Sequence, residues 1–436
     1  MDKAASGLGA RIGGLVRMAQ GERQLFVVVN VAVNLLLLLR SYVTMEVLDY
    51  RGLGLAALLQ SVVLAVGAMQ LGFLNGGYRL ICAAEGREAE RINNLLYSFF
   101  AGLTLVALIV TIGMLTVIDG GDADLVALLG LGGGVLTLVR TWMMNRMIAG
   151  GMLRRLNRIN FWSSVASLAT LTFIPVDPLV ACLAAIVVQP AVFVLAVAVT
   201  QRDLLPTAFE TDRSLIRSVI RAGFIIFLTG IFLQMNMVFE RWYVSGLMGV
   251  ADLGRLYLAI LFVTLFQLIP TSLDQVFMPP IVRAHVAGNH AHLRATLRKF
   301  FLVLAAYCAV TVLALLFVAE PLTRLVLPDY SGDLRYVYLL APGLIAFTLV
   351  SPFVMIFNVL IRYRYYLIAY GVGTALTASA FGATWAMGAP FDLDGVTLLR
   401  TGVYALMAAI LIFGYRAMVA GHPEFRFGVV RGTAAS

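Results

Sequence analysis

The sequence predicts an all-α membrane protein with about twelve transmembrane helices in two six-helix parallel repeats. Apolar residues make up 61% of the 436 residues and charged residues 13%, whereas soluble proteins average about half and a quarter. The apolar residues form runs of about 20, the length that crosses a bilayer core as a helix. The distribution of basic residues and an internal similarity then indicate the orientation and the repeat.

The predicted spans are separated by short polar segments. They lie near residues 25–45, 55–76, 94–117, 125–148, 160–176, 179–200, 222–246, 256–278, 299–318, 337–361, 365–387 and 394–415. The fifth span is short and rich in Ser and Thr, so eleven spans remain an alternative. The first span is full length and has no small-residue cleavage site, so we do not expect a removable signal peptide.

The basic residues predict a multi-pass protein with both termini in the cytoplasm. The loops expected to face outward hold few of the 32 Lys and Arg, namely Arg51, Arg255, Arg324 and Arg335. Most of the others lie in the alternate loops, which is the positive-inside pattern. The net charge of +9 therefore reflects membrane topology, and no nucleic-acid partner is expected.

The second half of the chain repeats features of the first at a shift of about two hundred residues. When Glu22–Gly77 is laid over Ala222–Pro279, Arg40 falls beside Arg241, and a Leu-Gly pair recurs at Leu53 and Leu253. Six spans per repeat give both repeats the same orientation, which predicts a transport site between the halves.

Four segments follow from this division. We predict an N-terminal bundle over residues 1–200 and a C-terminal bundle over 222–418, joined by a cytoplasmic linker over 201–221 and followed by a cytoplasmic tail over 419–436. Pro206 and alternating charges mark the linker. An ordinary surface loop with a short interfacial helix is the alternative for this segment.

The sequence offers no constellation for a metal, a disulfide or nucleotide hydrolysis. The three cysteines are far apart, and the His285–His292 cluster has no acidic or thiol companion. The glycine-rich run Gly130–Gly134 lies inside the fourth span without a following Lys-Ser/Thr pair, so it predicts close helix packing. We expect no cofactor and no catalytic residues.

Ionisable residues inside spans are costly in hydrocarbon and are therefore candidates for function. Four arginines, Arg40, Arg140, Arg241 and Arg400, are predicted to form a cationic substrate-binding cavity, because the forked guanidinium group suits phosphate and carboxylate. Snorkelling of each side chain to the headgroup layer is the alternative, and Arg146 fits that alternative best.

Acidic and polar residues near the same spans are candidates for coupling or gating. Glu240 and Asp274 could exchange a proton or sodium ion, although no pattern establishes coupling. The inner end of the eighth span carries Gln267 and Pro270, and we expect Pro270 to bend the helix and Pro279-Pro280 to end it. The matching end of the second span carries Gln70 and Asn75. Polar packing at two helix ends is the alternative interpretation.

The order of these features resembles the Wzx-type polysaccharide flippases of the multidrug/oligosaccharidyl-lipid/polysaccharide (MOP) flippase superfamily. The stretches that carry the resemblance are Asn34–Gly54 with Leu53–Ala56, Gln70–Arg79 with Glu85–Glu88, Glu240-Arg241 with Asp252–Gly254, Pro270–Pro280 and Leu327–Tyr330. The resemblance implies a MATE-like architecture of two lobes around a cavity lined by cationic residues, and alternating access in a bacterial inner membrane. Two further C-terminal spans, typical of the lipid II flippase, are missing.

The predicted function is translocation of polyprenyl-pyrophosphate-linked oligosaccharide repeat units, as in O-antigen or exopolysaccharide assembly. The expected partners are this lipid-linked substrate, membrane lipids, a glycan polymerase and a chain-length regulator. A cation-coupled exporter of small drugs with the same fold is the alternative, although acidic and aromatic linings would suit it better. A membrane enzyme or accessory protein of glycan assembly is a further alternative, disfavoured by the short outer loops.

Overall fold

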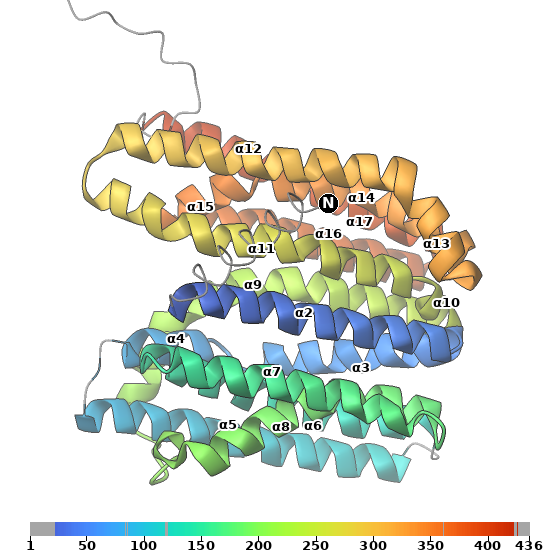
Figure 1. The fold of residues 1–436 in the computed structure, drawn as a ribbon, viewed down its shortest axis with the longest axis horizontal. Helices are drawn as coiled ribbons and strands as arrows, with labels where there is room; N and C mark the ends of the chain where they lie inside the picture. The colour runs from blue at the N-terminus through green and yellow to red at the C-terminus, as the bar shows by residue number, and fades with distance from the viewer. Residues whose placement is uncertain are drawn as a thin grey trace, which may run out of the picture. The chain divides into compact units, whose positions relative to one another are not determined.

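The computed structural model describes residues 22–82, 84, 86–117, 121–360, 362–422 and 425, and every regular element within these ranges is helical (Figure 1). Residues 1–21, where the sequence predicts the cytoplasmic N-terminus, the loop residue Glu85 and the tail beyond Phe425 lie outside the described residues. The chain divides into two compact units, one ending at Leu228 and the other starting at Thr229. The boundary falls inside one continuous helix, α9 (Arg213–Leu247).

Unit 1 contains the elements that precede α9 and the first turns of α9 itself. They are α2 (Glu22–Val47), α3 (Tyr50–Ala68), α4 (Phe73–Ile81), α5 (Gly86–Val117), α6 (Asp122–Ala149), α7 (Leu153–Ala169), η1 (Thr170–Phe173), α8 (Pro178–Thr200) and η2 (Arg202–Leu204). The predicted linker 201–221 comprises η2, a loop and the start of α9.

Unit 2 contains the rest of α9 and the elements that follow it. They are α10 (Val250–Arg255), α11 (Tyr257–Val286), α12 (His290–Ala314), η3 (Leu315–Ala319), α13 (Glu320–Val326), η4 (Pro328–Asp333), α14 (Leu334–Leu349), α15 (Ser351–Val359), α16 (Arg364–Ala386) and α17 (Leu393–Val419).

The predicted all-α membrane fold is confirmed. Eleven helical stretches in the described part of the chain are long and apolar enough to cross a membrane. The fifth predicted span is the exception, because α7 has only 17 residues and several polar ones. Together with η1 it still runs for roughly 30 Å, enough for one crossing. Its low hydropathy has a structural reason, since α7 packs against α2 and α8 and turns its polar side chains inward.

The two units use the same packing scheme internally. In unit 1 the last complete helix, α8, packs against α6 and α7. In unit 2 the last helix, α17, packs against α14 and α16 (Figure 1). Both last helices begin with an aspartate cap, in which Asp177 accepts a hydrogen bond from the Val180 amide and Asp392 from the Gly395 amide. This correspondence supports the duplicated module expected from the sequence.

Glycines allow helices to meet closely inside unit 1. A Cβ atom on Gly134 would lie 2.5 Å from Val66 of α3, and one on Gly130 would lie 2.7 Å from Val62. The expectation that the glycine-rich run serves helix packing is therefore confirmed. A second close contact joins α4 to α9, where a Cβ on Gly223 would lie 2.1 Å from the Gly72 carbonyl oxygen. The start of α9 is thereby held against α4.

We expect Gly223→Ala to lower the stability of the folded protein by about 1–3 kcal/mol, because the added methyl group would overlap the α4 backbone. Gly230→Ala is the matched control in the same helix, since a Cβ there meets open space and alanine favours the helix. Thermal unfolding in detergent compares the two variants. Equal unfolding midpoints would show that α4 and α9 do not depend on this contact.

Charged and polar side chains of α5 hold the loop that precedes α9. Arg91 donates from Nε to Oε2 of Glu210 at 2.9 Å and from Nη2 to Oδ2 of Asp212 at 2.8 Å. Hydrogen bonds from Ser214, and then from Arg91, lower the pKa of Asp212 to about 2. The hydrogen bond from Arg91 also lowers the pKa of Glu210. The ionised carboxylates of Glu210 and Asp212 therefore hold the loop against α5 through Arg91.

Docking of this loop should weaken in acid. Because the pKa of Asp212 is depressed from 3.8 to about 2 in the folded chain, the carboxylate stabilises the docked loop above pH 4 and loses this effect as the pH falls toward 2. Hydrogen exchange of residues 203–212, corrected for intrinsic rates, should rise over that window. The Glu210→Gln/Asp212→Asn variant should show the raised exchange already at neutral pH. A flat profile in the unaltered protein would contradict this.

Candidate functional site

One face of α7 carries the polar side chains around which unit 1 gathers its two candidate arginines. Asn160, Ser164 and Ser167 are spaced by four and three residues, so they share a helix face. All three are buried. Since α7 packs against both α2 and α8, this face is turned toward neighbouring helices.

Side chains from three helices contact this face. Nη2 of Arg140 in α6 donates to Oδ1 of Asn160 at 2.7 Å, and Nε2 of Gln189 in α8 donates to Oγ of Ser164 at 2.9 Å. Nη1 of Arg40 in α2 donates to Oγ of Ser167 at 3.1 Å and to the Ala185 carbonyl oxygen at 3.2 Å.

The structure therefore brings Arg40 and Arg140 to the same face of α7. Their contacts on α7 are seven residues apart, about 10 Å along the helix. Sequence reasoning selected both arginines but missed their polar partners, which it treated only as a sign of a weak span. The spacing of Asn160, Ser164 and Ser167 was the signal that could have identified them.

No carboxylate in the described part of the chain forms an ion pair with Arg140. Among the described residues its polar partner is the neutral amide of Asn160, and its guanidinium carbon lies 5.4 Å from the centre of the Phe193 ring. The Nε atom is buried and has no hydrogen-bond partner. The residue as a whole is partly buried, and a partly buried cation with so few described partners can bind an anion.

Unit 2 places its two candidate arginines beside Glu240. Nη1 of Arg400 in α17 lies 2.8 Å from Oε1 of Glu240 in α9, and both side chains are almost fully buried. The Arg400 guanidinium also donates to the Tyr404 hydroxyl at 3.1 and 3.2 Å. Arg241, the neighbour of Glu240, is 6% exposed.

The coupling candidates on α11 contact the break between α14 and α15. Oδ1 of Asp274 accepts a hydrogen bond from Oγ of Ser351 at 2.8 Å. Nε2 of Gln267 points to Oγ1 of Thr348 at 3.5 Å. Thr348 and Ser351 flank Val350, where α14 ends and α15 begins. Asp274 thus has a neutral partner, whereas Glu240 has a cationic one.

The prolines of α11 do not act as expected at the helix end. The prediction that Pro279-Pro280 end the helix is wrong, because α11 continues through both residues to Val286. Pro270 also lies inside the helix, where it cannot donate to the carbonyl of Phe266 four residues earlier. The hydroxyl of Tyr307 in α12 donates to that carbonyl oxygen at 3.0 Å. A neighbouring helix therefore satisfies the group that the proline exposes.

The candidates at the end of the second span lie at a sharp turn. Gln70 is in the turn between α3 and α4, and its buried Oε1 has no hydrogen-bond partner. Leu71 has a φ of 49° and Gly72 a φ of 87°, which is an unusual conformation for leucine. Asn75 follows, half-buried, in α4. The span that the sequence predicts as one run is therefore two helices.

Tyr307 and Pro270 should show energetic coupling. Tyr307→Phe leaves the Phe266 carbonyl without its partner, which should cost about 1–3 kcal/mol of stability. In a Pro270→Ala background the restored amide supplies that hydrogen bond, so Tyr307→Phe should then cost much less. Unfolding of the four proteins in a double-mutant cycle measures the difference. Additive effects would mean that the tyrosine hydroxyl does not replace the missing amide.

Comparison with known proteins shows the fold alone. No family model matches the chain, and neither does any curated protein. Among solved structures, an inward-facing multidrug resistance MATE family transporter of the MOP superfamily is 14% identical, with a TM-score of 0.73 over 94% of this chain and 100% of the other. The lipid II flippase MurJ in an inward closed conformation is also 14% identical, with a TM-score of 0.71 over 90% and 87%.

A third structure is a MOP superfamily transporter from Pyrococcus furiosus, described as having a binding pocket of reverse polarity. It is 17% identical, with a TM-score of 0.60 over 93% of this chain and 95% of the other. The fold is thus that of MOP superfamily transporters and flippases.

Proposed function

We propose that this protein translocates a lipid-linked anionic glycan, a polyprenyl-pyrophosphate-linked oligosaccharide, across a bacterial inner membrane by alternating access. The observation that carries the proposal is the partly buried charge of Arg140, whose polar partner among the described residues is a neutral amide. Guanidinium groups match phosphate and carboxylate oxygens in geometry and charge. A fold that also serves a lipid II flippase suits a substrate with a lipid anchor.

The two arginine sets have different roles in this proposal. Arg140 is the clearest binding group, because its charge has no carboxylate partner among the described residues. Arg400 is ion-paired with Glu240, so a substrate phosphate would have to compete with that carboxylate. Asp274 is the better candidate for proton or sodium coupling, since its partner is the neutral Ser351 hydroxyl. Both termini are proposed to be cytoplasmic, and a glycan polymerase and chain-length regulator are proposed as partners.

The second candidate is a cation-coupled exporter of small molecules. The similarity to a multidrug resistance MATE family transporter and the hydrogen-bonded Asp274 favour it. The two functions differ in the charge of the substrate that the binding site must hold. An exporter of cationic drugs would gain from removal of Arg140, whereas a transporter of phosphate-bearing substrate would lose its binding group.

Arg140→Gln should reduce flipping of lipid-linked oligosaccharide in proteoliposomes by roughly 10-fold or more, while thermal stability stays equal or rises because a partly buried charge without a described counter-charge is removed. Arg140→Lys should retain part of the activity, because the charge remains but the fork is lost. Arg158→Gln is the control, since Arg158 is an exposed arginine of α7. Unchanged flipping in Arg140→Gln, or improved export of a cationic dye, would contradict the proposal and favour the second candidate.

A further inference from the structure

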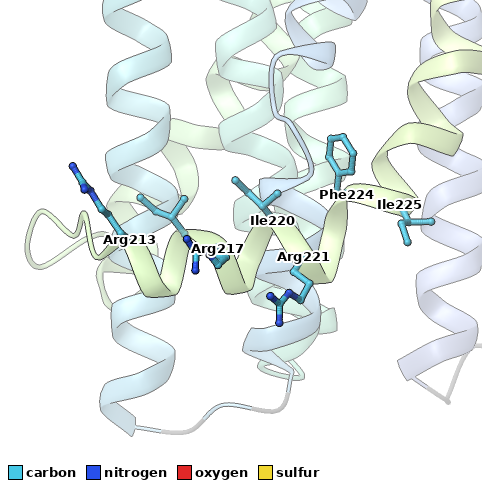
Figure 2. A pocket seen from close by; sticks show the side chains of 7 residues that line it. Arg213, Arg217, Ile220, Arg221, Phe224 and Ile225 are labelled. Atoms are coloured by element: carbon cyan, nitrogen blue, oxygen red, sulfur yellow. The ribbon is translucent and has the colours of Figure 1, made fainter.

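Three arginines form a stripe along the first turns of α9. Arg213, Arg217 and Arg221 recur every four residues, so they lie on one side of the helix. All three are exposed, while Val219 on another side is fully buried in the core of unit 1. Figure 2 shows these arginines along the helix with Ile220 and Phe224 between and beyond them. Together with Ile216 and Ile225, these five residues line a hollow of about 500 Å³.

The charges of this stripe are not neutralised by nearby carboxylates. The acidic residues just before α9, Glu210 and Asp212, both form ion pairs with Arg91. Within the described part of the chain, the three arginines of the stripe take part in no ion pair and no side-chain hydrogen bond. Three positive charges therefore face outward within about 12 Å of helix.

The stripe continues directly into an apolar surface. The apolar run starts at Ala222, and the first large side chains in it, Phe224 and Ile225, are 40% and 47% exposed. Helix α9 has 35 residues, or about 52 Å, which exceeds the hydrocarbon core of about 30 Å and reaches into the headgroup layer. Basic groups therefore lie next to side chains that suit acyl chains.

We infer that this arginine stripe binds the phosphate headgroup of an anionic membrane lipid, with the lipid chains against Phe224 and Ile225. The charge is complementary to a phosphate, and the adjoining apolar side chains favour a lipid over a soluble anion. Juxtamembrane arginines attract anionic lipid in this way. Because Gly223 packs against α4 on another side of the same turns, the stripe is held in place by unit 1. The inference goes beyond the proposed function, since it does not depend on the transported substrate.

The test is a titration of the full chain in neutral-detergent micelles with fluorescent phosphatidylglycerol, and in parallel with phosphatidylcholine that carries the same label. Wild type should prefer phosphatidylglycerol. The Arg213→Gln/Arg217→Gln/Arg221→Gln variant should lose affinity on the order of 100-fold, at about fivefold per arginine. The corresponding triple lysine variant should keep most of the affinity, because the charge is retained.

The matched control is Arg87→Gln/Arg158→Gln/Arg202→Gln, which removes the same charge from three exposed arginines outside the stripe. This control should bind phosphatidylglycerol like wild type. Equal affinity in the stripe variant and wild type, or an equal loss in the control, would overturn the inference. Binding of inorganic pyrophosphate by the wild type without any preference for phosphatidylglycerol over phosphatidylcholine would also overturn it, by showing that the stripe binds a free anion rather than a lipid.

Discussion

The packing of helices in unit 1 depends on the hydrogen bonding of polar side chains inside a bundle that is otherwise apolar. The buried face formed by Asn160, Ser164 and Ser167 could not be turned toward hydrocarbon, where unpaired polar groups cost several kcal/mol each. It is instead covered by α2 and α8, and Arg40, Arg140 and Gln189 reach it from three helices. The same contacts that orient α7 therefore hold two cations inside the unit.

The two units handle buried cations differently. In unit 2 the pairing of Arg400 with Glu240 brings α17 and α9 together, and removal of one partner alone would leave a buried charge. In unit 1 the stabilisation of Arg140 is weaker, because a single neutral amide accepts its hydrogen bond. In the proposed function an anionic substrate balances the charge of Arg140. This difference is why Arg140 carries the functional proposal.

Pro270 is tolerated inside α11 because a neighbouring helix supplies the missing hydrogen bond. The Tyr307 hydroxyl of α12 donates to the Phe266 carbonyl oxygen, which Pro270 leaves without an amide donor. Membrane helices can bend or break on this condition. This contact links the shape of α11 near Pro270 to the position of α12. A change in the bend of α11 would therefore require a change in its packing against α12.

The sequence by itself determined the class of the fold, the approximate positions of the apolar spans and the packing glycines. These features follow from hydropathy and residue size, and both properties can be read from short stretches of sequence. It also selected Arg40, Arg140, Arg241 and Arg400 as unusual, because a charge within an apolar run is visible locally. It did not give Asn160 as a partner of Arg140, the turn after Gln70, or the passage of α11 through Pro279-Pro280.

Only the tertiary structure decided those points, because each depends on which helix packs against which. Glu240 is adjacent to Arg241 in the chain but forms its ion pair with Arg400, 160 residues away. Tyr307 is 41 residues from the carbonyl that it satisfies. The packing of whole helices determines which residues pair at such separations, because buried polar groups must find hydrogen-bond partners. A local sequence pattern contains no information about these partners.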